Sequence, residues 1–234
     1  MGLCSSWDGT ISYSEFCDAA RALSEKWKLS NSACPPWTWV HCQKPIGFLH
    51  MRCFYAQCYL SLENFYCCSI SKEGTYHDQN QSSGEEPVDD TTLISTEFVQ
   101  LEVHQYDFHI VYSASYRVPV LYFRGYRCDG QPLTVDDIEK GLPANALKTL
   151  KESKWTFMTR EEHPFLNRPW YTFHPCGTSE WMKLLFSDSS SSEHGAVVEQ
   201  YLVSWLSVVG QVVGLQVPLE MLKGSNLKPP FSSD

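Results

Sequence analysis

The stretch FHPCGT at residues 173–178 combines residue types and a spacing that suit covalent chemistry on sulfur. Cys176 stands alone there, because the other nine cysteines all lie at or before Cys128. Side chains alternate along an extended chain, so His174 and Cys176 are predicted on one face. Pro175 fixes its own φ and favours an extended conformation for the residue before it. The stretch therefore predicts a thiol nucleophile with a polar neighbour.

A helix beginning just after this cysteine would favour its thiolate form. Thr178 is the expected N-cap, and Trp181, Met182 and Leu185 form an apolar face at helical spacing. The positive end of a helix dipole stabilises a neighbouring thiolate. A buried structural cysteine has the same spacing, since cysteine is among the most buried residue types. From the residues alone, both interpretations of Cys176 stay open.

Other kinds of cysteine enzyme match this stretch poorly. A phosphatase loop needs Arg six residues after the cysteine, where Met182 stands, and a thioredoxin-like motif needs a second cysteine in place of Ser179. A cysteine hydrolase on an unrelated fold remains an alternative, because it could use a distant histidine. The candidates for that role are His104, His109 and His163.

The remaining cysteines do not predict a metal site. His41, Cys42, Cys53 and Cys58 come nearest to a zinc-ligand set, but their spacings fit no familiar zinc motif. We therefore expect no metal and no cofactor. The N-terminus lacks a basic segment followed by an apolar one, so no signal peptide is expected. Ten cysteines in such a chain favour reduced thiols in the cytoplasm.

Charge and hydropathy argue against nucleic-acid binding and against a membrane-spanning segment. The net charge of −9 argues against nucleic acid, whose binding depends on Lys and Arg contacts to phosphate. No transmembrane segment is expected, because Ser204, Ser207 and Gln211 interrupt the most apolar stretch, 201–215. The N-terminal MGLCSS fits the myristoylation pattern with Gly2 as acceptor, although so short a pattern also occurs by chance.

Hydrophobic periodicity predicts a helix, then a run of strands, then further helices. Ser12 and Glu15 form a capping-box pattern at the start of a helix over 12–29. Strands are expected at 37–42, at 58–70 in two pieces, within 93–123 and near 170–175, and helices near 134–150, from 178 and over 196–213. Pro119 should lie at a sheet edge or a bulge. This order is typical of an α+β fold with an antiparallel sheet.

The chain reads as a single domain over residues 1–234. The stretch at about 71–92 is polar and acidic, and is predicted to be a flexible insert within that domain. Residues 44–57 show neither the hydrophobic period of a helix nor the alternation of a strand.

Thr134 and Asp137, flanked by Leu133 and Ile138, predict a capped helix start.

Four motifs together resemble the autophagy E2-like conjugating enzymes. They are YSASYRVPVLYF at 112–123, DGQPLT at 129–134, EEHPFLNRPWY at 161–171 and HPCGTSEWM at 174–182. The resemblance is specific from about 104 to 185, and looser over 12–40 and at YLSLEN. It implies an E2-like core, in which helices pack on an antiparallel β-meander, with an N-terminal helix.

The resemblance also implies a reaction and its partners. Cys176 would receive the C-terminal glycine of a ubiquitin-like modifier, autophagy-related protein 12, as a thioester from an E1-like activating enzyme. The acyl group would then pass to a lysine of an acceptor protein, autophagy-related protein 5. His174 stands where the family carries His or Asn, which implies orientation or oxyanion support. Tyr116 and Tyr122, on the facing strand in the family fold, could line the lysine path.

Two other functions remain as alternatives at this point. A sister enzyme of the family also carries His-Pro-Cys but transfers its modifier to phosphatidylethanolamine. A non-catalytic module that keeps the E2-like fold for binding is the second alternative, favoured by the atypical stretch 44–57. The expected location is the cytoplasm, with transient presence at autophagic membranes.

Overall fold

A six-stranded antiparallel sheet forms the centre of the protein, in the order β1-β2-β3-β4-β6-β5. The computed structural model describes residues 7–42, 57–72, 99–141, 158–187 and 194–222. The strands are β1 (Thr38–Cys42), β2 (Gln57–Lys72), β3 (Val99–Ser113), β4 (Val118–Tyr126), β5 (Met158–Glu162) and β6 (Pro169–Phe173). The helices are α1 (Tyr13–Ser30), α2 (Val135–Gly141), α4 (Thr178–Leu185), α5 (His194–Val209) and α6 (Leu219–Leu222), with short 3-10 turns η1 (Pro175–Gly177) and η2 (Gly210–Val213).

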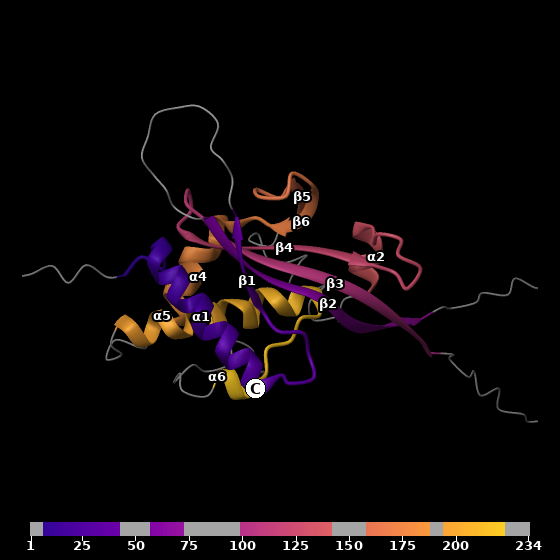
Figure 1. Cartoon of the computed structure of the whole chain (residues 1–234), viewed down its shortest axis with the longest axis horizontal. Coiled ribbons are helices and arrows are strands. Elements are labelled where there is room, and N and C mark those ends of the chain that lie inside the picture. The colour runs from indigo at the N-terminus through magenta and orange to yellow at the C-terminus, as the bar shows by residue number, and fades with distance from the viewer. Residues whose placement is uncertain (1–6, 43–56, 73–98, 142–157, 188–193, 223–234) are drawn as a thin grey trace, which may run out of the picture.

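Helices α1, α4, α5 and α6 lie together on one side of the sheet, while β5 and β6 lie on the other side of β4 in the same view (Figure 1). The predicted α+β class with an antiparallel sheet and an N-terminal helix is therefore confirmed. The predicted capping box also forms, since the Ser12 hydroxyl accepts from the Glu15 N–H and the Glu15 carboxylate accepts from the Ser12 N–H.

Helix α5 is the central helix of the core. Tyr201, Leu202, Trp205 and Leu206 are at most 1% exposed. The segment His194–Val213 is long and apolar enough to cross a membrane, but 67% of its most apolar window is buried inside the protein. Packing against α1 and the sheet accounts for its apolar composition.

Alternation along β3 gives the sheet two different faces. Phe108 and Ile110 belong to the main core beneath the helices. His109 points to the opposite face, since side chains alternate along a strand, and contacts the rings of Tyr59 and Trp170 there. This second face is covered by the loop 163–168 between β5 and β6, whose Phe165 ring stacks on Tyr59. The β5–β6 hairpin thus closes a smaller aromatic cluster on the far side of the sheet.

Three local features differ from the expectations or refine them. β2 is one strand where two pieces were predicted, because a bulge between Leu62 and Phe65 absorbs the irregularity and gives Asn64 a φ of 58°. Pro119 lies opposite Tyr112 of β3, in the part of β4 that β6 does not reach, so the predicted edge exists locally. β5 was not predicted, since its sequence MTREE is polar and its side chains are largely exposed.

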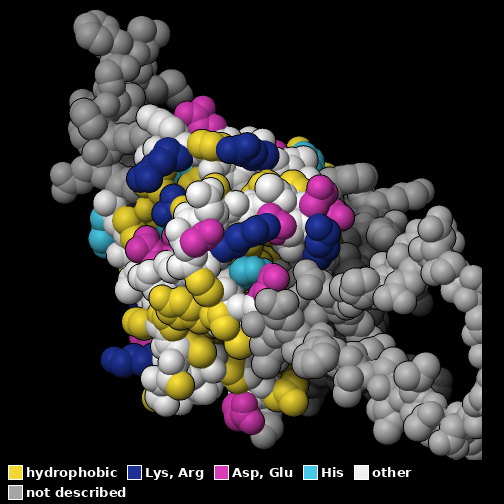
Figure 2. Space-filling view, turned by 90° about the vertical axis from the view of Figure 1, so that its right-hand side faces the viewer, with side chains coloured by type: hydrophobic (Ala, Val, Ile, Leu, Met, Phe, Trp, Pro, Cys, Tyr) yellow, Lys and Arg dark blue, Asp and Glu magenta, His cyan; other side chains and the backbone are white. Residues whose placement is uncertain are grey.

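Helix α2 begins as predicted, with reciprocal hydrogen bonds between Thr134 and Asp137. The segments 43–56 and 73–98, with most of the predicted acidic insert, and the helical run near residues 147–150 lie outside the described residues. On the face shown in Figure 2, Lys and Arg side chains lie among Asp and Glu side chains, and hydrophobic side chains gather beneath them.

Candidate active site

Cys176 lies at the surface, between the end of β6 and the beginning of α4, and its side chain is exposed. The chain does not stay extended there as predicted: Pro175–Gly177 form a 3-10 turn. His174 alone keeps the extended conformation, with φ −63° and ψ 128°. The prediction that His174 and Cys176 lie on one face of an extended segment is therefore wrong, because proline initiates a turn at this point.

His174 nevertheless contacts the cysteine, through the backbone. Its Nδ1 accepts a hydrogen bond from the Cys176 N–H at 3.2 Å. A neutral imidazole whose Nδ1 accepts must carry its hydrogen on Nε2. The His174 ring is thus fixed as a donor at Nε2, which suits support of a developing oxyanion better than removal of a proton.

Tyr116 contacts the same histidine. The two ring centroids are 5.5 Å apart and the rings meet edge to face at 80°. Tyr116 is 44% exposed and lies in the turn 114–117 between β3 and β4, so its predicted place on a strand is wrong. The turn brings it close to the end of β6, and the structure therefore gathers Tyr116, His174 and Cys176 at one surface.

Two other sequence-predicted residues are placed differently. Thr178 is the first residue of α4 and adopts helical φ and ψ of −60° and −44°, while Gly177 takes the N-cap position without a side-chain bond. The predicted cap is wrong, because the 3-10 turn already carries the chain into helical geometry before Thr178. Tyr122 pairs with Thr172 and packs on the His163 ring in the far-face cluster, where burial raises the pKa of its hydroxyl.

The alternative of a cysteine hydrolase needs a histidine that a carboxylate orders beside the sulfur. His109 and His163 are buried against each other on the far face, with Nδ1 and Nε2 3.0 Å apart. His104 is buried next to Glu102, at 3.4 Å. Within the described ranges, no carboxylate bonds to His174. The described residues therefore show no histidine–carboxylate pair bonded beside the sulfur.

Two members of the possible zinc-ligand set, His41 and Cys58, are in contact. Cys58 Sγ lies 3.0 Å from His41 Nδ1, across the β1–β2 pair. Within the part of the chain that the structure describes, no group of three or more His, Cys, Asp or Glu side chains could hold a metal ion. Cys53 lies outside that part.

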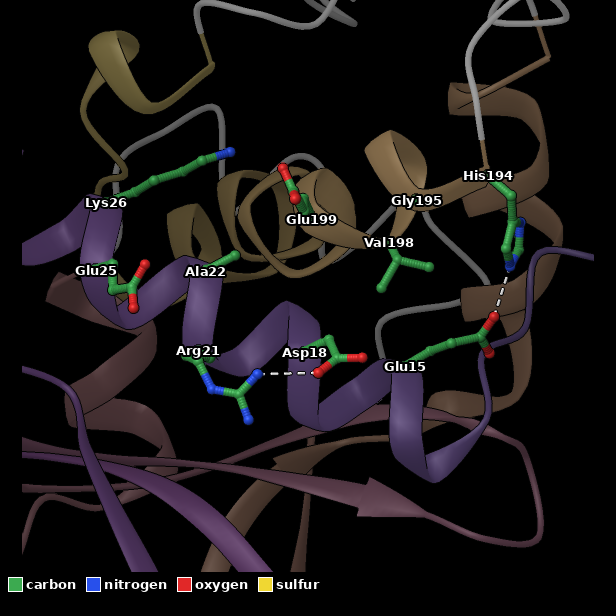
Figure 3. A pocket seen from close by; sticks show the side chains of 10 residues that line it. All are labelled: Glu15, Asp18, Arg21, Ala22, Glu25, Lys26, His194, Gly195, Val198 and Glu199. Atoms are coloured by element: carbon green, nitrogen blue, oxygen red, sulfur yellow. Dashed lines mark hydrogen bonds and ion pairs between the residues drawn. The ribbon is translucent and has the colours of Figure 1, made fainter.

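A separate pocket of about 490 Å³ lies between α1 and α5, away from the cysteine. Helix α1 contributes charged side chains of both signs to it, and α5 contributes Glu199 and His194. The Arg21–Asp18 ion pair and the His194–Glu15 contact lie on its wall (Figure 3). Since none of its lining residues is Tyr116, His174 or Cys176, this pocket is not part of the candidate active site.

Sequence reasoning missed one segment that packs against the site. Residues 7–11 lie along the first turn of α4, and Gly9 there has a φ of 82°. The Asp8-Gly9 dipeptide is a turn signal and was the available clue.

The sequence has named relatives over most of its length. The sequence matches the family described as autophagocytosis associated protein, active-site domain, over residues 15–220. It is 49% identical to the ubiquitin-like-conjugating enzyme ATG10 of Arabidopsis thaliana over 92% of this chain and 96% of that one. Autophagy-related protein 3 of Kluyveromyces lactis is 33% identical over 46% of this chain and 41% of its own.

A crystal structure of the autophagic E2 Atg10 also matches, with a TM-score of 0.39 and 17% identity over 87% of this chain and 97% of that one. The family match covers most of the chain, including the β3–β4 turn and the segment that carries Cys176. The family match and the 49% identical relative confirm the family predicted from the sequence. This chain belongs to the autophagy E2-like conjugating enzymes, the family of the autophagocytosis associated active-site domain.

Proposed function

We propose that this E2-like transferase carries a ubiquitin-like modifier as a thioester on Cys176 and passes it to a lysine of an acceptor protein. The observation that supports this most directly is the exposed sulfur of Cys176. The N–H of Cys176 donates to His174, whose ring packs against Tyr116. The C-terminal tail of another protein can reach a sulfur that lies at the surface. The pocket between α1 and α5 does not include Cys176.

The reaction has two acyl transfers. In the first, the Cys176 thiolate attacks the carbonyl of the modifier's C-terminal glycine, and the thiolate of an E1-like enzyme leaves. In the second, the neutral amine of a lysine attacks the same carbonyl, the Cys176 thiolate leaves, and the ammonium formed loses its proton to solvent. A thioester is activated enough that the second step needs mainly orientation and charge stabilisation.

The residues around Cys176 fit that second step. With its Nδ1 occupied by the Cys176 N–H, His174 presents Nε2–H as a donor for the oxygen that becomes negative during attack. The Tyr116 ring, packed edge to face on His174, holds the imidazole and borders the path of the incoming lysine. These roles make His174 and Tyr116 accessory to the nucleophile Cys176.

The proposed modifier and acceptor are autophagy-related proteins 12 and 5. The near-complete coverage of a relative named ATG10 supports this choice over the sister type, whose named representative matches less than half of either chain. We place the reaction in the cytoplasm, with transient presence at autophagic membranes. Acylation of Gly2, outside the described residues, stays a prediction from the sequence.

The test is a loading assay with E1-like enzyme, ATP and modifier, run on gels with and without reductant. The wild type should give a band that reductant removes. Cys176→Ser should convert it into a reductant-stable ester or lose it, and Cys176→Ala should lose it entirely. A reductant-labile band from the Cys176→Ala protein would refute the assignment.

A further inference from the structure

The segment Trp7–Ile11, called here the N-terminal strap, contacts two elements of the candidate active site: helix α4 and the turn 114–117 between β3 and β4. It contacts α4 through Gly9. A Cβ at that position would lie 1.8 Å from the Ser179 carbonyl oxygen and 3.0 Å from the Lys183 nitrogen. The strap backbone therefore lies directly against the first turn of α4, which begins two residues after Cys176. Only glycine can make so close an approach at a φ of 82°.

Two further contacts hold the strap to the helical layer. The Trp7 ring meets the rings of Phe186, at the end of α4, and Tyr201 of α5 edge to face, each at 5.9 Å. The Tyr201 hydroxyl donates to the Gly9 carbonyl at 2.8 Å in the protein interior. Both ends of α4 are thus in contact with the strap.

The other end of the strap binds the turn that carries Tyr116. The Ile11 N–H donates to the Arg117 carbonyl at 2.9 Å, and the Ile11 carbonyl accepts from the Tyr112 hydroxyl at 2.8 Å. Arg117 directly follows Tyr116 and has a φ of 54°, a left-handed conformation that is uncommon for residues other than glycine. Ile11 is 1% exposed, which anchors the strap in the core. The exposed Asp8–Arg117 pair at 3.7 Å adds little.

We propose that the N-terminal strap is a positioning element for lysine attack on the thioester. It fixes the start of α4, beside Cys176, relative to the β3–β4 turn, which carries Tyr116. The Tyr116–His174–Cys176 arrangement depends on that relation. Loading needs an exposed sulfur, whereas aminolysis needs alignment, and a displacement of about 1 Å can cost on the order of a hundredfold in rate. The inference rests on the proposed function and names further residues that serve it.

The test compares Gly9→Ala with Gly130→Ala in the full chain. Both glycines have a φ of 82°, but a Cβ at Gly130 would meet nothing within 4 Å. The two substitutions therefore impose the same backbone strain, and they differ in the contact with Ser179. Loading is followed with E1-like enzyme, ATP and modifier, and transfer by adding acceptor to the preformed thioester in a single turnover.

Gly9→Ala should load within twofold of Gly130→Ala and transfer about fourfold more slowly. A cycle with Tyr116→Ala separates positioning from general destabilisation. If the strap acts through the turn, Gly9→Ala should cost less than twofold in transfer once Tyr116 is already replaced by Ala. The proposal is overturned by equal losses in loading and transfer, by an undiminished loss in the Tyr116→Ala background, or by no loss in transfer.

Should Gly9→Ala fail to fold, Tyr112→Phe replaces it. This change removes the hydroxyl that bonds the Ile11 carbonyl and keeps the ring, with Tyr122→Phe as the matched control. We expect a threefold loss in transfer with loading retained, and unchanged transfer would overturn the proposal. Failure of the proposed function is recognised separately, because then neither the wild type nor Gly130→Ala would load or transfer the modifier.

Discussion

One His-Pro dipeptide follows β5 and a second follows β6, and the two lie in opposite environments. His163-Pro164 precedes the loop into β6, and its imidazole is completely buried in the far-face cluster. His174-Pro175 follows β6, and its imidazole is half-buried beside an exposed cysteine. The dipeptide itself does not distinguish packing from chemistry. The difference lies in whether the ring's partners include a group that a substrate can reach.

The far-face histidines have partners that fix a neutral pair. His163 Nδ1 accepts from the Phe165 N–H at 3.3 Å, so a neutral His163 carries its hydrogen on Nε2 and donates it to His109 Nδ1. Burial, and to a lesser extent His163 and Arg124, lower the pKa of His109 to about 3. At neutral pH His109 is therefore uncharged, and it contributes to packing.

The largest expected difference between the two dipeptides is in stability. His163→Ala should reduce the free energy of unfolding by roughly 3 kcal/mol, because it removes a fully buried ring and a hydrogen bond. Thermal unfolding should shift by roughly 6 to 12 °C. His174→Ala should cost less than about 1 kcal/mol, since its ring is partly exposed. Similar melting temperatures for the two variants would remove the distinction.

In the transfer of the modifier to lysine, His174→Ala should have the larger effect of the two substitutions. His174→Ala should slow single-turnover transfer to the acceptor lysine by roughly a hundredfold while thioester loading persists, because the proposed oxyanion donor is lost. His174→Asn should recover much of the rate, since an amide oxygen can accept the Cys176 N–H and leave the NH₂ as donor. Equal loss of loading and transfer in His174→Ala would count against a role in aminolysis.

The far-face pair also predicts a pH dependence of stability. The unfolded chain protonates His109 below its ordinary pKa of 6.5, while the folded protein resists protonation until about pH 3. The contribution of neutral His109 to the free energy of unfolding is thus fully present above pH 6.5, and it is lost progressively as the pH drops towards 3. Between pH 7 and pH 5 this group should account for about 2 kcal/mol. Urea unfolding at both pH values should show a smaller fall for His109→Gln, and identical falls would contradict the assignment.

The smallest effect concerns the two tyrosines. Tyr116→Ala should slow transfer about fivefold, because it removes the ring that packs on His174. Tyr116→Phe should stay within about twofold, since that contact is through the ring, and Tyr122→Phe should leave both steps unchanged. Transfer rates for the purified thioesters measure this, and a larger loss from Tyr122→Phe than from Tyr116→Ala would place the lysine path elsewhere.

Local signals in the sequence predicted two of the helix starts correctly. The Ser12–Glu15 box and the Thr134–Asp137 pair form as their spacing indicates, because each bond joins residues three apart. Where a turn replaced an extended segment, as at Pro175–Gly177, the same kind of reasoning placed Thr178 wrongly.

The site could be predicted only in part, since its contacts join distant segments. The family resemblance pointed to Cys176, His174 and Tyr116, and the structure brings all three together. The contact of Gly9 with Ser179 joins residues far apart in sequence and depends on a backbone conformation that no spacing rule predicts. β5 was missed because a polar edge strand has no apolar period to mark it.

The most direct test locates the acyl group on the chain itself. After loading with modifier, the Cys176→Ser protein is digested and the residue that carries the modifier's C-terminal remnant is identified by mass spectrometry, with the wild type analysed in parallel without reductant. The exposed thiols of Cys68 and Cys128 serve as internal controls. We predict the remnant on residue 176 in both proteins. A remnant on Cys68, Cys128 or any other cysteine, with residue 176 unmodified, would contradict the account.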